Sequence, residues 1–359
     1  MLTGQDHVTV YQLTQSATAV FVLACSGTAW FSSRFKPFRM LDVPNDRSLH
    51  AVPIPRSGGI AVVVSLALGM AYLWVRNSLQ SPLAIGCAAA VLVSVISFID
   101  DMHTLTPLLR LVVQVFAGAI AMSAGIHLST IHLPGIAYQL PYIPALACTL
   151  IFIVWMTNLY NFMDGMDGFA GGMAMIGFTI LGYLGLRAGA VGYAGVCFAA
   201  ACAAAGFLVF NFPPARIFMG DVGSSTLGFL VGIMGIWADI SNIAPLWVTA
   251  LIFSPIIVDA TVTLIRRIFA GEKFWRAHRS HYYQRLVRLG WSHRRVVLCE
   301  YLVMLSAAAS ALFAIQYSNA LSQWCVLLVW TAVYIALMRL VDRIWQASLK
   351  EQPAVPPAR

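Results

Sequence analysis

The side chains best suited to chemistry are acids and amides near the ends of long apolar stretches. The segment NLYNFMDGMDG (158–168) places Asn158, Asn161, Asp164 and Asp167 at every third position. Residues three apart are neighbours on a helix, so we expect these side chains to form one polar stripe. Ionisable groups at the end of an apolar helix are costly and are usually functional, although a hydrogen-bonded packing stripe is the alternative.

Two further segments carry carboxylates. DDMHTLTP (100–107) begins with Asp100 and Asp101, which repel each other unless a cation or a proton intervenes. NFPPARIFMGDVGS (211–224) holds Asp221 on a loop between two glycines. Magnesium typically takes one or two carboxylates together with phosphate oxygens, and phosphate also favours helix N-termini. Both segments therefore suit a magnesium site, and a simple helix cap is the alternative for each.

Cations and aromatic residues are concentrated in HRSHYYQRLVRLGWSHRR (278–295), a composition that suits a polyanionic ligand. The alternative is a basic surface that touches anionic lipid. We favour this second interpretation for Arg288, Arg294 and Arg295.

Two weaker features complete the set. A Pro-rich segment near the N-terminus contributes Arg47, His50 and Arg56. Asp259 stands alone within an apolar stretch, where it is expected either to be functional or to pair with Arg266.

These residues must be positioned by helices that cross a membrane. Hydrophobic residues make up 60% of the 359 residues, charged residues make up 10%, and the mean hydropathy is +0.79. A soluble domain carries about 25% charged residues, so we expect an all-α, polytopic integral membrane protein. A window of about 20 apolar residues predicts about eleven transmembrane helices. They lie near 9–31, 58–75, 82–99, 108–126, 142–159, 170–186, 190–210, 223–238, 244–264, 296–317 and 323–340.

The loops between these predicted spans differ in charge. Of the 22 Lys and Arg residues, only Arg76 and Arg187 fall on one side. The positive-inside rule then places the N-terminus outside and the C-terminus in the cytoplasm. This topology accounts for the net charge of +8, and we expect no nucleic-acid partner. Most of the acidic residues lie on the same side of the membrane as the basic residues. The active site is therefore predicted on the cytoplasmic loops.

The chain is expected to form one transmembrane catalytic domain, residues 1–345, followed by a disordered cytoplasmic tail, residues 346–359. The outer segment 127–141 is predicted to be a short ordered excursion. The seven cysteines lie in apolar stretches without a CxxC pair, which argues against a disulfide framework or a zinc site.

Carboxylates, amides and cations on one cytoplasmic face suit phosphoryl transfer to a membrane-embedded substrate. Magnesium neutralises charge on a diphosphate, and carboxylates hold the metal or take a proton. The alternative function is a membrane transporter or flippase of lipid-linked sugars. A transporter would place its polar groups near the bilayer midplane on broken helices, and apart from Asp259 the sequence does not do so.

The motifs and their order resemble the polyprenyl-phosphate N-acetylhexosamine-1-phosphate transferases, the WecA and MraY superfamily (glycosyltransferase family 4). The resemblance covers residues 30–340 and rests on the DxP…RxxH…GG loop, the DD pair, NxxNxxDGxDG, FMGDxGS and the late His-rich loop. It implies transfer of an N-acetylhexosamine-1-phosphate from a UDP-sugar to undecaprenyl phosphate, with release of UMP. It also implies a requirement for Mg²⁺, with Mn²⁺ as a substitute, and a place in the bacterial inner membrane.

The same resemblance implies roles for single residues. Asp221 and Asn161 match the metal ligands of the family. Asp100 and Asp101 match a pair assigned to the metal or to the lipid phosphate, with Asp100 as a candidate base. Asp164 is similar to a residue whose loss is usually severe. A phosphate monoester is already largely ionised at neutral pH, so a dedicated base is not essential.

The expected site is completed by residues for the substrates. Asn211, Phe218 and Asp167 match positions that hold the uracil, Phe218 by stacking. The expected catalytic residues are Asp100, Asp101, Asp164, Asp167, Asp221 and His281. The expected substrate-binding residues are Asn211, Phe218, Asp167, Arg47, His50, Arg56, His278 and Arg279.

The late loop departs from the better-defined branches of the family. His281 keeps the first position of an HxHH run, but Tyr283 and Gln284 occupy the later two. The absence of a triple His argues against a muramoyl-pentapeptide substrate. The form HRSHYYQRL resembles Gram-negative enzymes that initiate O-antigen synthesis on N-acetylfucosamine, N-acetylquinovosamine or N-acetylglucosamine. A homodimer is a further expectation, although the spans hold no convincing dimer motif.

Overall fold

The computed structural model of the protein describes residues 4–33, 40–44, 49, 52–272, 279–317 and 319–351. The helices in this part of the chain are α1 (Gly4–Ser32), α2 (Gly58–Val75), α3 (Ser81–His103), α4 (Pro107–Ser123), α5 (Tyr142–Met163), α6 (Phe169–Arg187), α7 (Val191–Asn211), α8 (Gly220–Ile240), α9 (Leu246–Ile252), α10 (Ser254–Phe269), α11 (Tyr282–Arg288), α12 (His293–Tyr317) and α13 (Ala320–Glu351). The strands are β1 (Leu41–Asp42), β2 (Ile54–Pro55), β3 (Thr130–Leu133) and β4 (Ile136–Gln139).

The helices confirm an all-α, multi-pass membrane protein. Each predicted span coincides with one helix or with the pair α9 and α10. Among the described residues, eight helices are long and apolar enough to cross a membrane, or nine if that pair is one span. Helix α4 is apolar but has only 17 residues, which is too short for this criterion. The number of spans and their orientation stay predictions.

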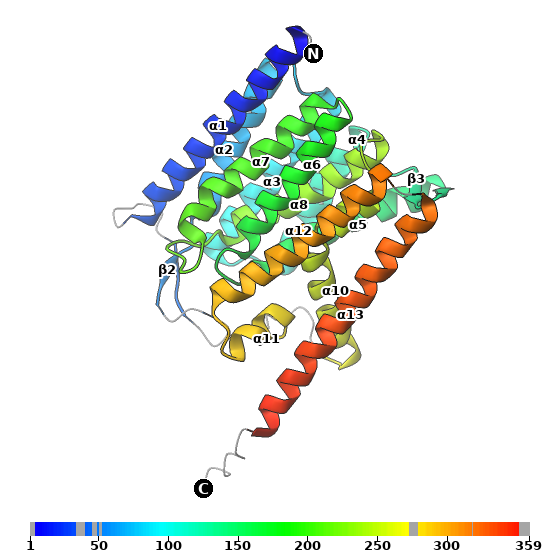
Figure 1. The fold of residues 1–359 in the computed structure, drawn as a ribbon. Coiled ribbons are helices and arrows are strands. Elements are labelled where there is room, and N and C mark those ends of the chain that lie inside the picture. The colour runs from blue at the N-terminus through cyan, green and yellow to red at the C-terminus, as the bar shows by residue number, and fades with distance from the viewer. Residues whose placement is uncertain are drawn as a thin grey trace.

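Helix α8 lies at the centre of the bundle and packs against α2, α3 and α5 (Figure 1). In the most apolar stretch of α8, 89% of the residues are buried. Small residues let membrane helices approach closely, and a Cβ atom at Gly228 would lie only 2.6 Å from the carbonyl oxygen of Met156 on α5. This close packing fixes Asp221, at the start of α8, beside the end of α5.

The C-terminal part of the chain is built differently. α9 and α10 meet at an angle of 84°, and α10 then leads to the short helix α11. Helix α13 crosses the outside of the bundle, and only 11% of its most apolar window is buried (Figure 1). The elements around α11 are therefore held by fewer packing contacts than α8.

The segment 127–141 contains an ordered hairpin, as predicted. β3 pairs antiparallel with β4, and His132 Nδ1 lies 2.7 Å from Asp239 Oδ1 at the end of α8. The other oxygen of Asp239 accepts a hydrogen bond of 2.7 Å from the N–H of Leu246, the first residue of α9. This buried carboxylate therefore ties the hairpin to the α8–α9 connection.

The first residues of the expected tail belong to α13. Residues 346–351 continue α13, which corrects the prediction that disorder begins at 346, since the helix simply extends six residues further. Residues 352–359 lie outside the described part of the chain. All seven cysteines are free thiols in the structure.

Candidate active site

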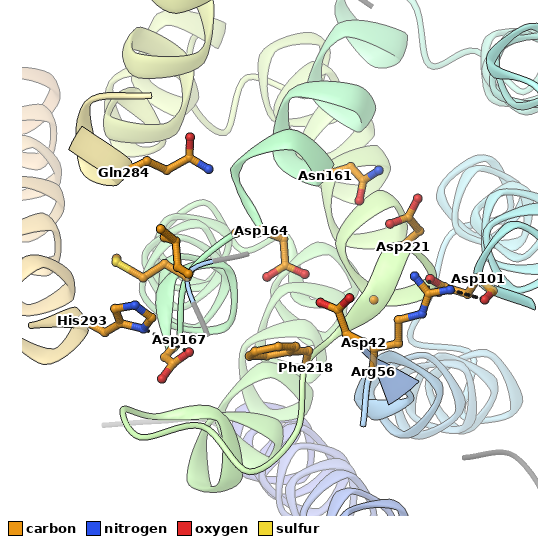
Figure 2. A pocket seen from close by; sticks show the side chains of 14 residues that line it. Asp42, Arg56, Asp101, Asn161, Asp164, Asp167, Phe218, Asp221, Gln284 and His293 are labelled. Atoms are coloured by element: carbon orange, nitrogen blue, oxygen red, sulfur yellow. Dashed lines mark hydrogen bonds and ion pairs between the residues drawn. The ribbon is translucent and has the colours of Figure 1, made fainter. Parts of the chain in front are cut away.

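A polar cavity of about 290 Å³ lies where the ends of α5 and α8 meet the β1–β2 loop and α11. Figure 2 shows side chains from these separate elements turned toward one space. The cavity is lined by Asp42, Leu49, Arg56, Asp101, Asn161, Asp164, Gly165, Met166, Asp167, Phe218, Gly220, Asp221, Gln284 and His293.

Backbone pairing fixes Phe218 in the wall of the cavity. The N–H of Phe218 donates to the carbonyl of Pro55 on β2 at 2.7 Å, and the N–H of Gly58 donates to the carbonyl of Phe218 at 3.0 Å. β2 also pairs with β1, which places Asp42 opposite Ile54. The segment before α2 therefore positions both an aromatic ring and a carboxylate.

Asp101 anchors the start of α8. Its side chain is 1% exposed, accepts a hydrogen bond of 3.1 Å from the N–H of Val222, and lies 3.7 Å from Arg56 Nε. Gly220 has a φ of +71°, and a Cβ there would lie 2.9 Å from the Asp101 carboxylate. Glycine thus permits both the left-handed turn and the close approach.

Arg110 bridges two of the predicted carboxylates. Its Nη1 lies 2.7 Å from Asp100 Oδ2 and 3.2 Å from Asp221 Oδ2. The second oxygen of Asp100 accepts a hydrogen bond of 2.6 Å from the N–H of Leu105, and Asp100 does not line the cavity. In this geometry Asp100 holds Arg110 and the backbone just after the end of its own helix.

The polar stripe at the end of α5 divides into two parts. Asn161 lines the cavity, and its Oδ1 accepts a hydrogen bond of 2.5 Å from Ser224 Oγ on α8. Asn158 instead donates to Gln114 at 2.6 Å, away from the cavity. The packing interpretation therefore holds for Asn158, whereas Asn161 faces the site.

Asp164 follows the last residue of α5 and faces the cavity (Figure 2). Burial, followed by the nearby charges of Asp221 and Asp101, raises the pKa of the Asp164 carboxyl to about 8. Three carboxyl groups thus lie close enough to repel one another, which favours a cation or a proton among them.

Asp167 and His293 form a pair on the opposite wall. His293 Nδ1 lies 3.2 Å from Asp167 Oδ1, and the N–H of Ala215 donates to Asp167 Oδ2 at 3.0 Å. Burial acts to raise the pKa of Asp167, but the hydrogen bonds from His293 and Ala215 outweigh it and lower that pKa. Asp167 is therefore held in its ionised form.

Asn211 is used to hold the loop rather than to face the cavity. Its Oδ1 accepts from the N–H of Gly168 at 2.8 Å, and its Nδ2 donates to the carbonyl of Ile217 at 2.9 Å. The hydroxyl of Tyr301 donates to the carbonyl of Gly168. Asn211 does not line the cavity, and its predicted contact with uracil stays a prediction.

The late loop presents Gln284 to the cavity and withholds His281. His281 is buried, and its Nδ1 lies 3.2 Å from Asp259 Oδ1. Arg266 pairs with Asp342 at 2.8 Å rather than with Asp259. Because His281 does not reach the cavity, its expected catalytic role stays a prediction that the geometry does not favour.

The structure brings together seven of the predicted residues around the cavity, namely Arg56, Asp101, Asn161, Asp164, Asp167, Phe218 and Asp221. Arg47, His50 and His278 lie outside the described residues. Arg279 is described, and it does not line the cavity.

Sequence reasoning missed several residues at the site. They are Asp42, His293 and Gln284, which line the cavity, and Arg110, which holds two carboxylates. Arg110 stands ten residues after Asp100, where it resembled an ordinary cytoplasmic-loop cation. His293 stands beside two arginines in a basic run, which hid its pairing with Asp167.

The donor set suits magnesium better than a metal that needs several protein ligands. Within the described ranges, no three His, Cys, Asp or Glu side chains gather closely enough to hold a metal ion. Magnesium is usually bound by one or two carboxylates and keeps other positions for water and phosphate. Asp221 and the amide oxygen of Asn161, both at the cavity, fit that pattern.

The fold and the cavity define a multi-pass membrane protein with a charged site at one end of its helical bundle. A family model described as "Glycosyl transferase family 4" matches residues 82–239. This matched range contains Asp100, Asp101, Asn161, Asp164 and Asp221.

Three relatives extend the match over most of the chain. A decaprenyl-phosphate N-acetylglucosaminephosphotransferase of Mycobacterium tuberculosis is 30% identical over 85% of this chain and 84% of its own length. A probable undecaprenyl-phosphate N-acetylglucosaminyl 1-phosphate transferase of Bacillus subtilis is 28% identical over 76% of both chains. An undecaprenyl-phosphate alpha-N-acetylglucosaminyl 1-phosphate transferase of Escherichia coli is 25% identical over 87% of this chain and 86% of its own length. The chain therefore belongs to glycosyl transferase family 4.

Proposed function

We propose that this protein transfers an N-acetylhexosamine-1-phosphate from a UDP-sugar to undecaprenyl phosphate. An oxygen of the lipid phosphate attacks the sugar-bound phosphorus, and the bond from that phosphorus to the bridging oxygen breaks. The bridging oxygen leaves on UMP, and the lipid keeps a diphosphate that carries the sugar. The printed names of the three relatives support this reaction.

The observation that carries the proposal is the meeting of carboxylates, an amide and a cation with an aromatic ring in one cavity. Phe218 offers a face for the uracil, and the ionised Asp167 offers an acceptor for its N–H. Arg56 offers a positive charge near the diphosphate. An aromatic ring and charged side chains in one cavity match the base and the diphosphate of a nucleoside diphosphate.

Asp221 and Asn161 would hold the Mg²⁺, which neutralises charge on the diphosphate when it is bound. Arg110 offsets the repulsion between Asp221 and Asp100 while no metal is bound, and the metal would take over this charge compensation. Ser224 orients the Asn161 amide through its hydrogen bond to Oδ1. The contact from Ser224 preorganises the amide oxygen, so less rearrangement of Asn161 is needed when the cation binds.

The nucleophile needs no dedicated base in this proposal. A phosphate monoester is largely ionised at neutral pH, and the Asp100 carboxylate is already occupied by Arg110 and Leu105. In this proposal Asp100 therefore holds the positive charge of Arg110 in place and does not accept a proton from the nucleophile.

We further propose that the reaction occurs at the cytoplasmic face of the bacterial inner membrane and initiates O-antigen or a related polysaccharide. The excess of Lys and Arg in loops on the side of the cavity supports this orientation. The relatives are named for N-acetylglucosamine, while Gln284 stands where an HxHH run would place a histidine. A panel of UDP-N-acetylhexosamines compared at equal concentration would give the preference.

The transporter alternative has one feature in its favour, the broken helix α9–α10 with its buried Asp259. That carboxylate is engaged by α11 and by Thr263. It is therefore occupied in holding the fold and is not available to a substrate path.

The test is release of UMP by the purified protein in detergent, with UDP-N-acetylhexosamine, undecaprenyl phosphate and Mg²⁺. We expect release only when both the lipid phosphate and the metal are present. Movement of lipid-linked sugar across proteoliposomes without any UMP release would instead favour the transporter.

A further inference from the structure

Helix α11 forms part of the cavity wall, and other elements must hold it in place. This helix has only seven residues, Tyr282–Arg288, yet it presents Gln284 to the cavity. A helix this short is not stable by itself, so its position must come from contacts with other elements.

The anchor is Asp259, in the middle of α10. Its Oδ1 accepts hydrogen bonds from the N–H of Tyr282 at 3.0 Å and from Thr263 Oγ1 at 3.0 Å, and it lies 3.2 Å from His281 Nδ1. Its Oδ2 accepts from the N–H of Tyr283 at 3.2 Å. The first N–H groups of a helix have no partner within the helix, and a negative charge is favourable at that end. The buried carboxylate of Asp259 thus supplies both the hydrogen-bond acceptor for these N–H groups and the negative charge.

The anchored residues reach the loop that carries Asp164 and Asp167. The ring of Tyr283 stacks on Phe169 at 5.0 Å and on His281 at 5.8 Å between ring centroids. The Tyr283 hydroxyl lies against Gly165, where a Cβ atom would collide with it. A shift of α11 would therefore also disturb the loop that begins at Asp164.

The same arrangement orients Gln284. Its Oε1 accepts a hydrogen bond of 3.3 Å from the N–H of His281. A backbone N–H can only donate, so the oxygen of the Gln284 amide is assigned to it, and the NH₂ group lies on the side of Gly165.

We propose that Asp259 is a positioning residue, which fixes α11 so that Gln284 forms the cavity wall and Tyr283 supports the loop at Gly165. The proposal deepens the proposed function, on which it rests for the statement that this cavity is the active site. Asp259 itself does not line the cavity and does not touch a ligand there.

A second acidic residue on the other side of α11 provides a matched control. Asp342 on α13 pairs with Arg285 at 2.8 Å and with Arg266 at 2.8 Å, and both guanidinium groups lie over the ring of Tyr282. These groups are partly exposed, and exposed ion pairs contribute little. Asp342 therefore contacts the same helix without carrying its position.

The test combines hydrogen exchange with kinetics on four variants of the full-length protein in detergent: Asp259→Asn, Asp342→Asn, Gln284→Ala and the double variant D259N/Q284A. In D259N we expect faster exchange confined to residues 279–290, together with a fall in kcat/KM of about tenfold or more, since small misplacements are costly to catalysis. D342N should keep the exchange pattern and stay within about threefold of the wild-type kcat/KM. The double variant should lose less than the product of the two single losses, because both changes remove the same contact.

Several results would overturn the proposal. These are wild-type exchange at 279–290 in D259N, an equal local loss of protection in D342N, or fully multiplicative losses in the double variant. If D259N is not recovered folded, Asp259→Glu keeps the charge, displaces the carboxylate and should show the same local loss of protection. The exchange experiment is independent of turnover. If the wild-type protein releases no UMP while D259N still exchanges faster at residues 279–290, the positioning role is supported and the proposed function is overturned.

Discussion

The two sides of the cavity are held in different ways. The floor consists of residues at the ends of α3, α5 and α8, which are long helices packed through small residues. The opposite wall includes Gln284 on α11, a short helix held by the buried carboxylate of Asp259. The floor inherits its geometry from the bundle, whereas the wall depends on a few polar contacts. The floor therefore suits a fixed arrangement of charges, and the wall is where substrate preference can vary without loss of the fold.

The largest effect is expected at the floor, in Asp221→Asn. This change removes the charge proposed to hold Mg²⁺, and the metal's contribution of several kcal/mol predicts a fall in UMP release of at least about 100-fold. Asp239→Asn, at the far end of the same helix, is the matched control and should leave the turnover of folded protein unchanged. Wild-type turnover in D221N would remove Asp221 from the site.

Arg110→Gln tests how the floor balances its charges. Arg110 competes with a cation for Asp221 and Asp100, so its loss should lower the Mg²⁺ concentration for half-maximal activity, by about severalfold. A titration of UMP release with Mg²⁺ measures this. An increase in the Mg²⁺ requirement would mean that Arg110 assists metal binding instead.

A smaller effect is expected at the nucleotide end. Phe218→Ala should raise the KM for the UDP-sugar severalfold, since a stacking contact is worth about 0.5–1.5 kcal/mol beyond burial. Phe212→Ala, an aromatic residue on the same segment that does not line the cavity, is the control. Equal KM values in F218A and the wild type would show that the ring does not stack on the uracil.

The smallest effect is a shift in pH dependence for His293→Ala. The hydrogen bond from His293 lowers the pKa of Asp167, so the ionised carboxylate persists to low pH in the wild type and is lost as the pH falls through that lowered pKa. Without His293, burial should raise this pKa, and the acid limb of kcat/KM should move to higher pH. An unchanged acid limb in H293A would separate Asp167 from substrate binding.

The same contrast explains which features could be predicted from the sequence. The helices and the floor residues Asp101, Asn161, Asp164 and Asp221 follow from hydropathy and local motifs, because each motif lies at one end of a long helix. The roles of Arg110 and Asp259 depend on contacts between elements far apart in sequence, which local spacing does not encode. Asn211 shows the converse, because its motif predicts a ligand contact while its amide is used between Gly168 and Ile217.

The most direct test of the central claim follows the sugar-bound phosphorus. The protein would be incubated with undecaprenyl phosphate, Mg²⁺ and a UDP-N-acetylhexosamine labelled with radioactive phosphorus in its β-phosphate. We predict that the label enters the lipid extract in amounts equal to the unlabelled UMP released. Label that stays in the aqueous phase as UDP, with unlabelled sugar on the lipid, would show that the sugar alone is transferred and would contradict the account.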